Sequence, residues 1–153
     1  MLQKVSAILV TAALLTGTAA ATAVFAQPAS AQQFAIEVKL NGKNLQFPHD
    51  IVTENGVVYV NASALADALG GYAAWDTMTE SVLISKENKY ALRMYKNSTF
   101  AYRNGKEFRV PFPPRKAEGG VLVPLVFIAE ELGADVTYDA ASRTYHLSIP
   151  IHT

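Results

Sequence analysis

The sequence predicts an α+β fold of two tandem repeats, each a mostly antiparallel, curled β-sheet packed on one α-helix. One observation is a repeat at a fixed offset, without a gap: Asn41-Gly42-Lys43 returns as Asn104-Gly105-Lys106, and Leu69-Gly70 as Leu132-Gly133. Another is that the hydrophobic period of each copy changes from that of strands to that of a helix and back. Turn residues, helix stops and apolar spacing are what recur, so the repeat indicates architecture rather than catalysis.

The segment 1–31 is predicted to be a signal peptide. Lys4 gives it a positive start, residues 5–15 are apolar, and Ala29-Ser30-Ala31 offers the better small-residue cleavage site. Val24-Phe25-Ala26 is a second candidate site. The alternative is an uncleaved membrane anchor, because residues 5–26 are apolar or small and long enough to span a bilayer. Their many Ala, Thr and Gly residues disfavour insertion, so cleavage is the expectation.

Each repeat is predicted to begin with a β-hairpin. Residues 36–40 alternate apolar and polar before Asn41-Gly42, two residues that tolerate the positive φ angles of a tight turn. In the second copy an aromatic strand precedes Asn104-Gly105 in the same way. The same hairpin is therefore written twice in different residues.

A short apolar strand follows in each copy, at 57–60 and 121–123, and leads at once into a predicted helix. The apolar residues of the two helices recur at i, i+3, i+4 and i+7: Ala62, Leu65, Ala66 and Leu69, then Leu125, Ile128, Ala129 and Leu132. One face of each helix is therefore expected to be core. Pro124 suits the first helical position, and Gly70 and Gly133 suit the helix ends.

Two strands are predicted after each helix. The first ends at Asp76 or Asp139, which are expected to make polar turns, and the second covers 82–84 or 145–149. Alternation at 90–94 predicts a further strand that bridges the copies. A helix with one apolar face can cover one curled sheet, which favours one sheet per repeat. The predicted division is a signal peptide at 1–31, a first repeat at 32–95 and a second at 96–153.

The absence of cysteine excludes a lipid-modified cysteine after the signal and excludes disulfides. No apolar tail follows at the C-terminus, so we expect no second anchor and no membrane span after cleavage. The expected location is therefore extracellular or associated with the cell wall.

The pattern resembles the copper amine oxidase N-terminal domain-like repeat, also called the stalk domain, of secreted and surface proteins from Gram-positive-type bacteria. The resemblance rests on four segments of the sequence. They are Asn104-Gly105-Lys106, the run from Gly120 to Ala134, Val136-Thr137-Tyr138-Asp139, and the weaker first copy from Asn55 to Asp76. This sequence departs from the family pattern at Val126, where an Arg is usual, and at Asn61, where a Pro is expected. In the oxidases the module looks like an appendage to a separate copper-containing domain, so the resemblance implies a non-catalytic role.

The residues give no independent sign of an enzyme, a cofactor or a metal site. The histidines, His49, His146 and His152, lack convincing ligand spacing, and no thiolate is available to help them. No nucleophile elbow, phosphate-binding loop or His-Glu-x-x-His motif occurs. We therefore expect no catalytic residues.

The basic residues are concentrated between Lys86 and Lys116, where nine Lys and Arg stand against Glu87 and Glu107. Aromatic residues are interleaved with them, a composition that can hold an anionic polymer by charge and stacking. The candidate surface is Arg103, Lys106, Arg109, Arg115, Lys116, Tyr102 and Phe127. The alternative is ordinary strand alternation, with aromatic residues inward and Lys or Arg outward. Phe127 lies opposite the apolar helix face, where it can pack against the other repeat or mark a partner surface.

Three functions follow from these observations. The first is a spacer or adhesive module at the cell envelope that binds an anionic wall polymer such as teichoic acid or peptidoglycan, and not nucleic acid. The second is an inhibitor or regulatory partner of a secreted enzyme, which would present an edge strand or the Phe127 surface. The third is a metal-binding protein. The sequence leaves the ligand and the oligomeric state open.

Overall fold

The computed structural model describes residues 35–151. The predicted signal peptide, its two candidate cleavage sites and His152 lie outside the described residues. No helix within 35–151 is long and apolar enough to cross a membrane. From Ile36 onward, the described residues form one compact unit.

The strands and helices recur in the same order in the two halves of this unit. The first half contains β1 (Glu37–Leu40), β2 (Lys43–Asn44), β3 (Val52–Glu54), β4 (Val57–Asn61), α2 (Ala62–Ala68), β5 (Tyr72–Asp76) and β6 (Ser81–Lys86). β7 (Tyr90–Tyr95) follows as the bridging strand. The second half contains β8 (Phe100–Arg103), β9 (Lys106–Arg109), β10 (Arg115–Ala117), β11 (Gly120–Pro124), α3 (Leu125–Glu131), β12 (Asp135–Asp139) and β13 (Thr144–Ser148). The α+β class is therefore confirmed.

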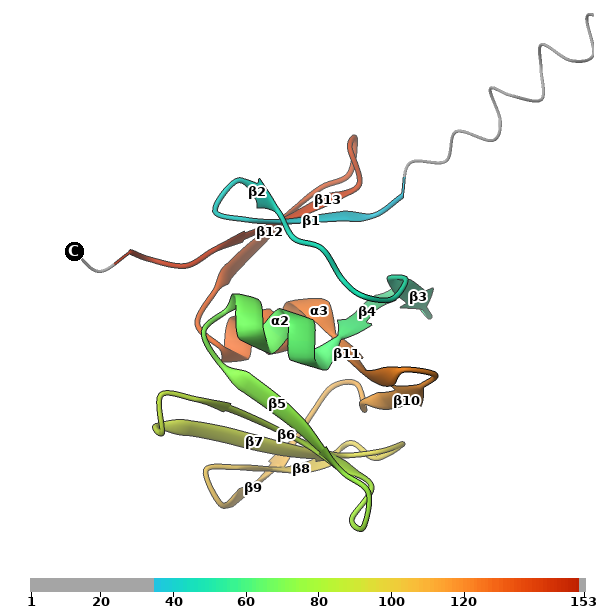
Figure 1. Ribbon diagram of the computed structural model, residues 1–153, viewed down its shortest axis with the longest axis vertical. Coiled ribbons are helices and arrows are strands. Elements are labelled where there is room, and N and C mark those ends of the chain that lie inside the picture. Colours follow the sequence, from blue (N-terminus) through green and yellow to red (C-terminus); the bar gives the residue numbers. More distant parts are fainter. Residues whose placement is uncertain (1–34, 152–153) are drawn as a thin grey trace, which may run out of the picture. The chain divides into compact units, whose positions relative to one another are not determined.

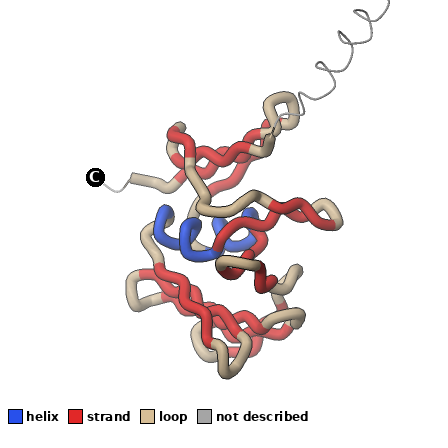
Figure 2. The backbone as a smooth tube through the Cα atoms, turned by 45° about the vertical axis from the view of Figure 1, so that its right-hand side comes forward, coloured by secondary structure: helices blue, strands red, loops and turns tan. Residues whose placement is uncertain are grey.

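The described strands form three sheets, which Figures 1 and 2 show around the two helices. The β13 sheet has the order β12-β13-β1-β2, and the central sheet has the order β10-β11-β4-β3. The five-stranded sheet has the order β5-β6-β7-β8-β9. Both helices lie between the β13 sheet and the five-stranded sheet, and each contacts β4 and β11 of the central sheet.

Every sheet contains strands from both halves, so the expectation that each repeat has a sheet of its own is wrong. The hairpin β5–β6 is continued by β7 and then by the hairpin β8–β9 of the second half. In return, β13 of the second half pairs in parallel with β1 of the first. Alternation identifies a strand but not its neighbour, and these pairings are long-range. The predicted boundary between residues 95 and 96 stays a prediction, and it falls between β7 and β8, which are adjacent in one sheet.

The two halves meet where β4 pairs with β11 in antiparallel fashion. Val60 lies opposite Val123, which stands at the offset of the sequence repeat from it, and both are 0% exposed. The pairing is symmetrical about this point, because Asn61 faces Leu122 and Tyr59 faces Pro124. The central sheet therefore joins corresponding strands of the two halves side by side.

One hydrophobic core runs through both helices and all three sheets. Its largest fully buried aliphatic side chains come from α2, β6, β7, α3 and β13 and the residue that follows α2: Leu65, Leu69, Ile84, Leu92, Met94, Leu125, Ile128 and Leu147. The helical residues among them belong to the predicted apolar stripes. Burial of these stripes against shared sheets stabilises both halves together.

The polar turns form as predicted. Asn41 and Asn104 both have positive φ and begin the tight turns of their hairpins. The Oδ1 atom of Asp76 accepts hydrogen bonds from the backbone N–H groups of Met78 and Thr79, at 2.9 and 3.3 Å. Asp139 accepts the corresponding pair in its own turn, at 2.9 and 3.4 Å. The helices differ at their starts: Asn61 caps α2 with its side chain, whereas Pro124 stands at the N-cap of α3, one place before the predicted position.

Candidate functional site

The predicted basic surface is divided among different faces of the sheets. In β8 and β9, Arg103 and Lys106 lie opposite each other on the side of the buried Ala101. Tyr102 and Arg109 lie on the other side, because successive side chains of a strand point to opposite faces. The sequence therefore predicted exposed side chains of both faces as one surface, and the structure separates them.

Arg103 connects the five-stranded sheet to α3. Its Nε atom donates to Oε2 of Glu131 at 3.0 Å, and Nη2 donates to Oε1 of the same carboxylate. The guanidinium carbon lies 3.6 Å from the centroid of the Phe108 ring, and Phe108 in turn stacks on Phe127 with centroids 6.2 Å apart. Arg103 and the half-buried Phe127 thus pack against neighbouring side chains, while the Arg103 side chain stays 35% exposed.

Tyr90 completes the contacts of this carboxylate, because its hydroxyl group donates to Oε2 of Glu131. Burial raises the pKa of the Tyr90 phenol above its ordinary value, and the hydrogen bond to Glu131 raises it further. The phenol therefore remains protonated as a donor. Lys86 adds a contact at the end of α3, where its Nζ atom donates to the carbonyl oxygen of Leu132 at 2.8 Å.

Arg115 and Lys116 belong to the central sheet. Arg115 forms an ion pair with Glu54 of β3 at 2.8 Å, and its guanidinium lies 5.2 Å from the centroid of the Tyr59 ring. The Nζ atom of Lys116 lies 5.5 Å from the centroid of the Trp75 ring. These two cations therefore lie in a different sheet from Tyr102 and Arg109.

The solvent side of the five-stranded sheet carries a row of aromatic rings, which we name the outer aromatic face. Its members are Arg93, Tyr95, Phe100, Tyr102 and Arg109. Tyr102 makes edge-to-face contacts with Tyr95 and Phe100, with centroids 6.4 and 5.4 Å apart. The guanidinium of Arg109 lies 5.4 Å from the centroid of Phe100. Arg93 lies beside Asp76 at 3.6 Å and donates to Ser81 at 2.7 Å.

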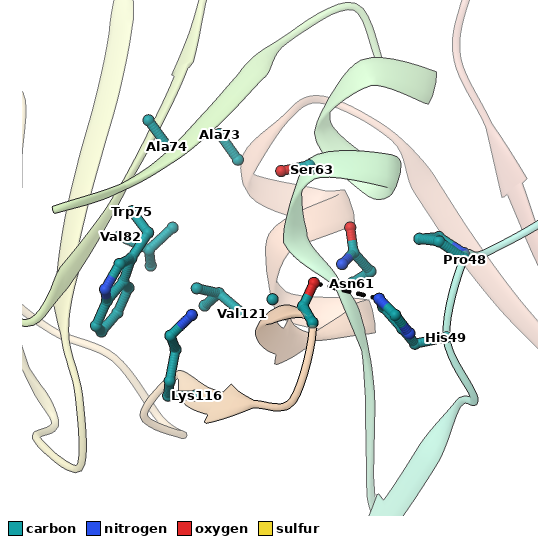
Figure 3. Close-up of a pocket in the computed structure, with 12 residues that line it drawn as sticks. Pro48, His49, Asn61, Ser63, Ala73, Ala74, Trp75, Val82, Lys116 and Val121 are labelled. Carbon is teal, nitrogen blue, oxygen red and sulfur yellow. Dashed lines mark hydrogen bonds between the residues drawn. The ribbon is translucent and has the colours of Figure 1, made fainter. Parts of the chain in front are cut away.

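A cavity of about 350 Å³ opens where β5, the start of α2, the loop after β2 and the turn between β10 and β11 meet (Figure 3). Its polar or aromatic lining residues include His49, Asn61, Ser63, Trp75 and Lys116. Of these, only Lys116 belongs to the binding surface that the sequence predicts. His49 enters the sequence analysis only as a candidate metal ligand. The five residues come from four separate segments, because only Asn61 and Ser63 are close in sequence, so no spacing in the sequence could have grouped all of them.

Comparison with known proteins supports the resemblance noted above. The family model described as the copper amine oxidase N-terminal domain matches residues 39–147, more than half of the chain. The chain belongs to this family. No curated protein and no solved structure gives a significant match.

In copper amine oxidases the N-terminal domain is a non-catalytic domain. Its match in this chain extends from β1 to β13, and so includes strands of all three sheets and both helices. Within residues 35–151, no group of three or more His, Cys, Asp or Glu side chains is arranged to hold a metal ion. Within residues 35–151, the outer aromatic face and the cavity are two surfaces that bring aromatic and polar side chains together.

Proposed function

We propose that this member of the copper amine oxidase N-terminal domain family is an exported, non-catalytic module, made of two copies of one unit, that binds a cell-wall polymer through its outer aromatic face. The signal-like segment 1–31 supports export. The matching order of the elements supports two copies, because α2 and α3 begin at Ala62 and Leu125, which are equivalent positions of the sequence repeat.

The observation that carries the binding proposal is the aromatic row on the solvent side of the five-stranded sheet. Tyr102 contacts both Tyr95 and Phe100, and it is 37% exposed although it is a large ring. Exposed aromatic rings on a rigid sheet can stack on the apolar faces of sugar rings, while a guanidinium binds carboxylate or phosphate groups. The face also carries Glu107 opposite Tyr102, so its charges are mixed. A glycan with spaced anionic groups, such as peptidoglycan, suits this mixture better than a uniformly charged polyanion.

The test is co-sedimentation of the purified protein with insoluble peptidoglycan. The double variant Tyr102→Ala/Arg109→Gln should bind at least about tenfold more weakly, because truncating a central aromatic or Arg contact typically costs about 2 kcal/mol. The matched control is Tyr138→Ala/Lys43→Gln, which removes one exposed ring and one exposed cation from the β13 sheet. The control should bind as the unmodified protein does. Equal losses in the two double variants, or unchanged binding in the first, would refute the outer aromatic face as the site.

A further inference from the structure

We infer that the cavity beside Trp75 is a second binding site, for a single acidic sugar, meaning a pyranose ring that carries a carboxylate. At about 350 Å³ the cavity lies at the small end of ligand pockets, which range from about 300 to 1,000 Å³. It therefore suits a small ligand and not a long polymer segment. This inference does not rest on the outer aromatic face, because no residue of that face lines the cavity.

One wall of the cavity provides an aromatic surface with a cation above it. Trp75 packs against the core and also lines the cavity, and the Nζ atom of Lys116 lies 5.5 Å from its ring centroid. Figure 3 shows Trp75 and Lys116 on the side opposite His49 and Pro48. The C–H face of a sugar ring can stack on an indole, and the exposed ammonium group is placed to meet a carboxylate on that sugar. Moving Lys116 aside costs little, because an exposed cation–π contact contributes only about 0.5–1 kcal/mol.

The opposite wall offers a hydrogen-bond donor that has no partner among the described residues. Asn61 is only 7% exposed, and its Oδ1 atom accepts the backbone N–H of Ala64 at 2.9 Å. This bond identifies the other end of the amide as Nδ2, and no residue within 35–151 accepts a hydrogen bond from it. This Nδ2 atom is not fully buried, because within residues 35–151 only the Nε atom of Arg115 is a fully buried side-chain nitrogen or oxygen without a partner, so the donor is accessible from the cavity that Asn61 lines. A ligand hydroxyl or carboxylate in the cavity would satisfy it.

His49 adds a hydrogen-bond acceptor, and Ser63 adds a hydroxyl group that can both donate and accept. The Nε2 atom of His49 lies 3.2 Å from the carbonyl oxygen of Gly119. A carbonyl can only accept, so Nε2 carries the proton and Nδ1 of the neutral ring is an acceptor. Ser63 contributes an exposed hydroxyl group. Hydroxyl-rich ligands need such mixed partners, whereas none of the described lining residues is acidic. The lining thus favours a ligand with hydroxyl groups and a negative charge.

The corresponding place in the second half shows that the fold does not require these polar groups. At the offset of the repeat, Phe112 corresponds to His49, Pro124 to Asn61, Val126 to Ser63 and Tyr138 to Trp75, and Thr53 corresponds to Lys116. α3 begins without any side-chain cap, so a helix at this place of the fold can form without the bond that Asn61 makes at the start of α2. The polar residues His49, Asn61 and Ser63 are therefore specific to this cavity and are not repeated at the corresponding place in the second half.

The cavity can be tested through Trp75, because it is the only tryptophan of the chain. We would titrate the purified protein with N-acetylmuramic acid and with N-acetylglucosamine, which share a ring and differ in one carboxylate-bearing ether. N-acetylmuramic acid should change the Trp75 emission saturably. Its affinity should be about tenfold higher than that of N-acetylglucosamine, because its carboxylate adds one charge-assisted contact with Lys116. Equal responses to the two sugars, or no response to either, would overturn the inference.

Two variants separate this site from the proposed polymer-binding face. Lys116→Gln, an exposed change that spares the core, should abolish the preference for the acidic sugar. Lys106→Gln removes the same charge from β9 and should leave the preference intact. The Tyr102→Ala/Arg109→Gln protein should retain the Trp75 response even when it no longer sediments with peptidoglycan. A preference that persists in Lys116→Gln would contradict the role of the ammonium group.

Discussion

Leu65 of α2 and Ile128 of α3 occupy corresponding places in the two halves, and both are 0% exposed. We predict that Leu65→Ala and Ile128→Ala each lower the free energy of unfolding of the whole unit by about 2–5 kcal/mol, since each loses apolar contacts and leaves a cavity. The shared sheets determine that the effect is global. β5–β6 need β7 and β8–β9 beside them, and β12–β13 need β1, so neither half can unfold and leave the other's sheets complete. A domain of this size typically has about 5–15 kcal/mol of stability, so both variants should remain folded in water.

Urea denaturation followed by Trp75 fluorescence and by far-ultraviolet circular dichroism provides the measurement. Trp75 lies in β5 of the first half, so it reports on Ile128→Ala only if the halves unfold together. The Trp75 midpoint should fall by about 1–2.5 M urea at an m-value of about 2 kcal/mol/M, and the two probes should coincide. Val126→Ala on the same helix is the control: that side chain is 37% exposed, so its free energy of unfolding should change by about 0.5 kcal/mol or less. A Trp75 transition that stays in place while circular dichroism detects an earlier phase would refute the single cooperative unit.

Three further predictions concern polar groups and turns. Glu131→Gln should lower the free energy of unfolding by about 1–3 kcal/mol in the same urea experiment, because it weakens charge-assisted hydrogen bonds that hold α3 to the five-stranded sheet. A loss of free energy smaller than that caused by an exposed substitution would contradict this role. Hydrogen bonds from Thr79 hold the pKa of Asp76 below its ordinary value of 3.8. The ionised Asp76 carboxylate therefore stabilises the fold above pH 3.8, and this stabilisation is lost as the pH falls through the lowered pKa. Asp76→Asn should therefore be less stable than the unmodified protein at pH 7, and the difference should vanish in acid; a constant difference across the titration would argue against ionisation as its source. Gly119→Ala should be more destabilising than Gly56→Ala. Both glycines have positive φ, but only at Gly119 would an added Cβ atom meet the His49 imidazole, at 2.5 Å. Equal melting temperatures of the two variants would contradict this steric effect of His49.

The local elements could be predicted because their determinants lie close together in the sequence. Asn41-Gly42 and Asn104-Gly105 specify the hairpin turns, since both of their residues adopt positive φ. Asp76 and Asp139 accept hydrogen bonds from residues two and three positions later, so their turns need no distant partner. The helical stripes were equally legible, because i, i+3, i+4 and i+7 spacing depends only on the helix itself.

The sheet partners could not be predicted because a strand's alternation does not reveal its neighbour. β1 and β13 are the first and last strands of the described chain, yet they pair in register from Glu37 with Thr144 to Leu40 with Leu147. The distribution of the candidate surface over different faces could not be predicted for a related reason. Arg103 and Tyr102 are adjacent in sequence, yet one contacts α3 and the other faces solvent, and the direction of each depends on which side of the sheet the helices cover. A basic stretch that runs through strands therefore combines packing residues with surface residues.

The comparison of corresponding positions separates what the fold demands from what it leaves free. Asn41 and Asn104 are identical because each closes a hairpin and accepts a hydrogen bond from the neighbouring strand, from Ile149 and Ala91 respectively. No such bond constrains Trp75, which packs against the core and is exchanged for tyrosine at its counterpart, so this position of the repeat accepts an aromatic ring other than indole. In the proposed copies, residues that serve the backbone should stay alike while those that meet a ligand can diverge. The cavity is where His49, Asn61 and Ser63 of the first half are replaced by apolar residues in the second, and this asymmetry argues that its lining serves binding rather than architecture.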